Sequence, residues 1–89
     1  MDIGILRDIR AIVVSPITGG LELQHPNDID ALAESYGPLR VLGVIGQRES
    51  ECATMHGPVR FTVPTALTVN GAPPIPFELL TEYTERVAA

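Results

Sequence analysis

Short segments of alternating or β-branched apolar residues dominate this chain, and two stretches have helical spacing instead. The most apolar segment covers 39–46, directly after the helix-breaking pair Gly37-Pro38 and directly before the most polar part of the chain. Both faces of a strand over 39–46 would be largely apolar, which is typical of a strand that is covered on both sides. The pattern therefore predicts a central strand here. Gly43 inside it indicates a bulge or the close approach of another chain.

Two further strands are predicted before this segment. Residues 9–14 are rich in β-branched side chains, follow an extended lead-in over 1–6, and end at Ser15-Pro16. Residues 18–20 read Thr-Gly-Gly, which favours a hairpin turn, and 21–24 alternate as a half-exposed return strand does.

The region after 39–46 is harder to interpret. Residues 46–57 could form a long loop, or partly a strand that turns back at Gly57-Pro58. Residues 59–63 and 65–69 alternate cleanly and are separated by Pro64. We expect three residues of the first of these segments to face the core: Val59, Phe61 and Val63.

Two amphipathic helices complete the pattern. The first has Asn27 as its expected N-cap and Gly37 as its C-terminal residue, with an apolar stripe made of Ile29, Leu32, Ala33 and Tyr36. The second begins at Pro76 or Phe77, and its expected inward side chains are Leu79, Leu80, Tyr83 and Val87. Glu82 and Arg86 are four residues apart in the order that favours an ion pair.

Together these elements predict one α+β domain over 1–89 in the order β-β-α-β-β-β-α. We expect a mainly antiparallel sheet with both helices packed on one face.

Composition adds a reason to expect a partner. The chain has 89 residues, of which 45% are hydrophobic, a high share for a domain with so little interior. We interpret the excess as apolar surface that is buried against a protein, first of all a second copy of the chain. The opposing interpretation is that many small alanines raise the share without forming a patch.

Charge excludes several classes of partner. The net charge is −5 and all six basic residues are arginines, so the chain lacks the basic excess of a nucleic-acid-binding protein. No apolar run is long enough to cross a membrane, and the one cysteine cannot form an internal disulfide. We expect a cytoplasmic protein without membrane association.

Candidate chemistry is confined to the polar segment. Arg48, Cys52 and His56 could bind a ligand, and Cys52 with His56 could act as a nucleophilic pair in a small enzyme with a site between subunits. The acidic neighbours Glu49 and Glu51 oppose a reactive thiolate. With one cysteine and two histidines, the chain offers too few ligands for a zinc site, and we expect no cofactor or metal.

The hypothesis we favour is a non-catalytic interaction module or a subunit of a homo- or hetero-oligomeric assembly. A small accessory or structural protein of a phage or mobile element belongs to this class. If both helices cover one face of the sheet, the other face mixes arginine, apolar and hydroxyl side chains, as protein interfaces do. The predicted interface residues are Arg40, Leu42, Val44, Arg60 and Thr62.

Overall fold

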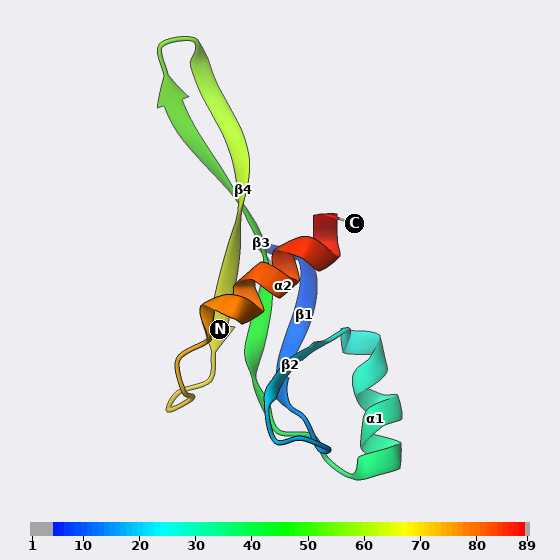
Figure 1. Cartoon of the computed structure of the whole chain (residues 1–89). Coiled ribbons are helices and arrows are strands. Elements are labelled where there is room, and N and C mark those ends of the chain that lie inside the picture. The colour runs from blue at the N-terminus through cyan, green and yellow to red at the C-terminus, as the bar shows by residue number, and fades with distance from the viewer. Residues whose placement is uncertain (1–4, 89) are drawn as a thin grey trace.

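The computed structural model describes residues 5–88 and shows a curled, four-stranded antiparallel sheet with two α-helices (Figure 1). The sheet order is β2-β1-β3-β4. The strands are β1 (Leu6–Val14), β2 (Leu21–Gln24), β3 (Val41–Thr54) and β4 (Gly57–Thr68). A 3-10 turn, η1 (Pro26–Asp28), precedes α1 (Ile29–Tyr36), and α2 (Phe77–Ala88) closes the chain. The predicted α+β class is confirmed, and the segments 59–63 and 65–69 join through Pro64 into the single strand β4.

Helix α2 covers the core. Its Leu79 and Tyr83 are buried against Ile12, Leu23 and Ile45 of the sheet. Leu80 and Val87 pack partly against the same cluster, so the inward face of α2 matches the sequence pattern. Tyr83 supplies the largest fully buried side chain of the described residues.

Helix α1 is set apart from α2 (Figure 1) and has no buried residue. Its start also differs from the sequence-based expectation, because Asn27 does not act as the N-cap. The N–H of Asn27 donates to Nδ1 of His25 at 3.1 Å, so His25 caps the 3-10 turn that leads into the helix. At the other end, Gly37 donates to the Ala33 carbonyl and has the positive φ, +82°, that glycine favours. Its ψ of −179° lies outside the left-handed helical region that the sequence indicated.

Near its beginning, β1 has a bulge, and this bulge is joined to α2. Asp8 has φ +51° between Arg7 and Arg10, where the register with β3 shifts. The hydroxyl of Tyr83 donates to the Asp8 carbonyl at 2.9 Å. One hydrogen bond thus satisfies a backbone group that the bulge removes from the strand ladder. Of the extended lead-in expected over 1–6, residues 1–4 lie outside the described residues.

The backbone of β4 leaves no room for a Cβ atom at Gly43. A Cβ at this position would lie 2.3 Å from the carbonyl oxygen of Leu67 and 2.8 Å from Cα of Thr68. The predicted bulge is present beside it, since the register between β1 and β3 shifts from Ile12–Gly43 to Val13–Val41. The close backbone belongs to β4 of the same chain and not to another chain, as the alternative interpretation expected.

We expect Gly43→Ala to lower the free energy of unfolding by about 1–3 kcal/mol, because the new methyl group must displace backbone. Gly20→Ala is the matched control, because its Cβ would meet nothing closer than Thr18 Oγ1 at 3.6 Å. Urea denaturation measures both variants. Equal stability of the two variants would contradict the close approach of β4 to β3.

We expect Tyr83→Phe to lower the free energy of unfolding by about 1–2 kcal/mol, because the bulge carbonyl loses its donor. Tyr36→Phe, at an exposed position of α1, should leave stability unchanged within about 0.5 kcal/mol.

The contribution of Tyr83 to stability also depends on pH. Burial, and secondly the charge of Asp8, raise the pKa of Tyr83 above its ordinary value of 10.0, while Arg10 opposes the rise. The unfolded chain therefore loses this proton at lower pH than the folded chain. The stabilisation is complete below pH 10.0 and is lost as pH rises from there through the folded-state pKa. Denaturation curves at rising pH should show this loss in the wild type and less of it in Tyr83→Phe.

Candidate functional site

Among residues 5–88, no third strand lies beside the outer half of the β3–β4 hairpin. Strand β1 pairs with β3 only as far as Leu6 opposite Arg48, whereas β3 and β4 stay paired to Thr54 opposite Gly57. We call residues 49–62 the arm and the remaining described residues the body. The arm projects from the body (Figure 1) and contributes to a longest dimension of 53 Å against 27 and 23 Å in the other directions.

A two-residue turn, Met55-His56, closes the arm. Gly57 follows with φ +105°, and the hydroxyl of Thr54 donates to the Gly57 carbonyl while accepting from the N–H of His56. Of the two interpretations of 46–57, the strand with a hairpin is therefore the one observed.

One face of the arm is apolar and exposed. Phe61 pairs with Ser50, and Val59 pairs with Cys52, so these four side chains point to the same side of the ribbon. Phe61 is 44% exposed and Val59 is 49% exposed. We name Cys52, Val59 and Phe61 the apolar arm face; it continues at the base into Val63. The expectation that Val59 and Phe61 face the core is wrong, because none of the described elements forms a layer over them at this distance from the body.

Charges are distributed unequally between the two faces of the arm. Arg60 and Glu49 lie on the opposite face, where their side chains approach to 3.6 Å, and Arg7 reaches Glu49 at 3.8 Å. These exposed pairs add little stability. The side of the ribbon that carries the apolar arm face includes positions 48, 50, 52 and 54 of β3 and their partners in β4. Arg48 is the one charged residue among these positions.

The edges of the arm are poorly suited to adding another strand. The N–H of Val69 donates to the Leu42 carbonyl at 2.8 Å. By the alternation of an antiparallel ladder, even-numbered residues of β4 then direct their backbone groups to the open edge. Pro58 and Pro64 occupy two of these positions and offer no N–H there. A partner is therefore more readily bound by the face of the arm than by its edge.

The predicted interface residues do not form one surface. Leu42 is 2% exposed and belongs to the core, because the bulge at this point of β3 turns its side chain toward Ile12. Val44 pairs with Leu67, and Thr62 pairs with Glu49. Val44 and Glu49 lie an odd number of positions apart in β3, so their side chains lie on opposite faces of the sheet. Val44 therefore faces the side opposite to Thr62 and Arg60. Arg40 precedes β3 and is exposed.

The candidate ligand residues are spread along the arm. Arg48 and Cys52 share a face but are four strand residues apart, about 13 Å, and His56 lies in the turn beyond them. Cys52 is exposed, with its thiol 3.7 Å from the Ala53 carbonyl. Within residues 5–88, no three histidine, cysteine or acidic side chains are grouped as metal ligands would be.

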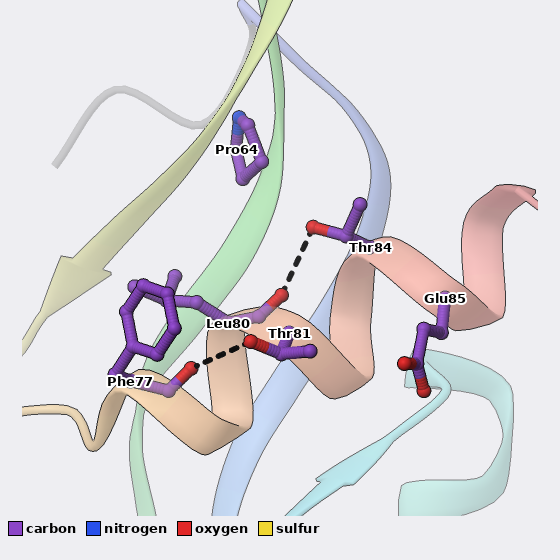
Figure 2. Close-up of a pocket in the computed structure, with 6 residues that line it drawn as sticks. All are labelled: Pro64, Phe77, Leu80, Thr81, Thr84 and Glu85. Atoms are coloured by element: carbon purple, nitrogen blue, oxygen red, sulfur yellow. Dashed lines mark hydrogen bonds between the residues drawn. The ribbon is translucent and has the colours of Figure 1, made fainter.

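A second surface, which the sequence did not single out, lies between α2 and β4. A groove of about 390 Å³ is lined by Pro64 of β4 and by the outer side of α2. Figure 2 shows Pro64 above the helix, with Phe77 and Leu80 beneath it. We name it the α2 groove, and its lining residues are Pro64, Phe77, Leu80, Thr81, Thr84 and Glu85.

The groove is apolar because its hydroxyl groups are occupied. Thr81 donates to the Phe77 carbonyl at 3.3 Å and Thr84 donates to the Leu80 carbonyl at 3.0 Å, which leaves their methyl groups for contact (Figure 2). Phe77 is 76% exposed. The sequence signal for this surface is Phe77 itself, an aromatic residue outside the inward stripe of α2.

Comparison of the chain with protein-family models, curated proteins and solved structures finds no match. No helix in the described part of the chain is long and apolar enough to span a membrane. The case for function therefore rests on the arm and on the groove.

We expect the backbone amides of Ser50, Cys52 and Phe61 to exchange with solvent at least about 100-fold faster than those of Val44 and Leu67 in dilute solution. The arm can open alone, because an isolated two-stranded ribbon is marginally stable in water. Hydrogen exchange followed by NMR measures these amides separately. Equal protection along the whole hairpin would show that the arm and body open together.

Proposed function

We propose that this chain is a non-catalytic subunit of a protein assembly and that the arm is the element that binds the partner. The observation that carries the proposal is the exposure of Phe61 and Val59 on a ribbon that, in the part of the chain that the structure describes, two strands support. Such a ribbon gains little from its own side chains. A partner surface that covers the apolar arm face would stabilise both the ribbon and the exposed side chains.

The turn of the arm supports the same proposal. Met55 is 99% exposed at the tip. Methionine adapts its shape to an apolar surface at low cost, and aromatic residues are frequent in the centre of interfaces. The arm thus offers Phe61 as an anchor and Met55 as an adaptable contact at its end.

The alternative function, a small enzyme or ligand-binding protein with a site between subunits, has weaker support. It requires Arg48, Cys52 and His56 to converge, and within one chain they follow one another along the exposed arm. Substituting Cys52 and His56 by alanine would abolish activity under that hypothesis and would leave the core of the body intact.

We expect the wild-type protein to self-associate at micromolar concentration and Phe61→Asp to weaken this association by more than about 30-fold, as expected for a central interface residue. Sedimentation velocity over a concentration series measures the effect. Phe61 is already partly exposed, so the substitution should leave the core folded.

The matched control is Ile17→Asp. Ile17 is 72% exposed in the turn between β1 and β2 and belongs neither to the arm nor to the groove. It should assemble as the wild type does. A wild-type protein that stays monomeric throughout the series, or a Phe61→Asp variant that assembles normally, would refute the proposed role of the arm in self-association.

A further inference from the structure

The apolar arm face, when extended by Val63 at its base, and the α2 groove have similar lengths. From Val59 to Val63 the strand advances by four residues, about 13 Å. From Phe77 to Glu85 the helix advances by eight residues, about 12 Å. Both surfaces are mainly apolar along this length, and the described residues of the chain leave both of them open.

Their charges are complementary. Arg48 is the charged residue on the side of the ribbon that carries the apolar arm face. Helix α2 carries three glutamates, and Glu82 is held by Arg86 at 2.6 Å. Among described residues, Glu78 and Glu85 have no such ion pair, and Glu85 borders the groove with its carboxylate turned away from Pro64 (Figure 2). An acidic rim would favour a ribbon that brings an arginine.

The two surfaces of one molecule do not cover each other. The arm extends away from α2 (Figure 1), while the groove lies where β4 is still part of the body, at Pro64. The arm and the groove of a second copy are therefore available to cover these two surfaces.

We propose that the apolar arm face of one copy binds in the α2 groove of a second copy, which makes the contact head to tail. The inference rests on the proposed function, because it takes the arm as the contact element, and it adds the identity of the partner and the place of contact. Each copy has one arm and one groove. The contact therefore generates a ring if its rotation closes, and an open chain of subunits if it does not.

Mixing two defective variants tests this arrangement. Phe61→Asp damages the arm and keeps the groove, whereas Phe77→Asp damages the groove and keeps the arm. Each variant alone should be monomeric at concentrations where the wild type assembles. Their equimolar mixture should form a one-to-one heterodimer that grows no further, because one intact arm meets one intact groove. Sedimentation velocity distinguishes these species.

The substitutions spare the core. Both side chains are at least 44% exposed, and a carboxylate at position 77 lies in the first turn of α2, where it interacts favourably with the helix dipole. Circular dichroism and urea denaturation should show wild-type folding for both variants. Ile17→Asp again serves as the exposed apolar control and should assemble alone.

The outcomes separate the two proposals. If Phe77→Asp assembles like the wild type while Phe61→Asp does not, the arm is an interface and the groove is not its site. If both are monomeric and the mixture stays monomeric, the head-to-tail contact is refuted. If Phe61→Asp assembles, the proposed function fails as well.

Cross-linking gives a second readout that needs no disruptive change. Cys52 is the one cysteine of the chain and lies on the apolar arm face. In Thr84→Cys, a short bismaleimide should join Cys52 to the groove of the next copy and give a ladder of covalent oligomers. The wild type, and the Thr84→Cys protein that also carries Cys52→Ala, should give none. Covalent dimers of the wild type would instead indicate an arm-to-arm contact and overturn the inference.

Discussion

Strand β1 stops pairing with β3 at Arg48, and β3 continues for six more residues. This difference in strand length divides the protein into two parts with different sources of stability. On one side of Arg48, three or four strands share ladders and α2 covers a closed core that includes Ile12, Ile45 and Tyr83. On the other side, β4 is the one neighbour of β3 among residues 5–88. Because an isolated two-stranded ribbon is marginally stable in water, the arm has a weaker source of stability than the body.

Helix α2 belongs to the body and approaches β4 at Pro64, two residues from the base of the arm. Tyr83 holds the helix to the bulge of β1 through the Asp8 carbonyl, and Arg86 donates to the Leu23 carbonyl of β2 at 3.2 Å. Leu80 and Thr84 flank Tyr83 on the same helix and face the groove. The hydrogen bonds that fix the core therefore also fix the groove, which is built on a helix and a strand. If the groove binds a partner, its fixed geometry lowers the entropic cost of binding on the side of the groove.

The hydrophobic pattern predicted the strands, the inward face of α2 and the Glu82–Arg86 pair, because each depends on local periodicity. The hydrophobic pattern failed where the burial of a residue depends on other elements of the fold. Leu42 was expected on an open face, yet one bulge residue places it in the core. Phe61 lies in an alternating apolar pattern, as residues facing a core do. This pattern alone does not distinguish a strand face that is covered from one that is exposed. The stripe of α1 was also correct as a pattern, but no residue of α1 is buried. The groove joins Pro64 to residues of α2, and such a pairing depends on tertiary structure.

The edges of the arm carry features that oppose the addition of further strands from other molecules. Pro58 and Pro64 remove donors from the open edge of β4. On the other edge, the odd-numbered residues of β3 beyond Arg48 direct backbone groups outward, and two of these three residues are Glu49 and Glu51. Their charges oppose the approach of a like strand. Proline on one edge and carboxylates on the other thus make strand addition to the arm less favourable than side-chain packing on the apolar arm face.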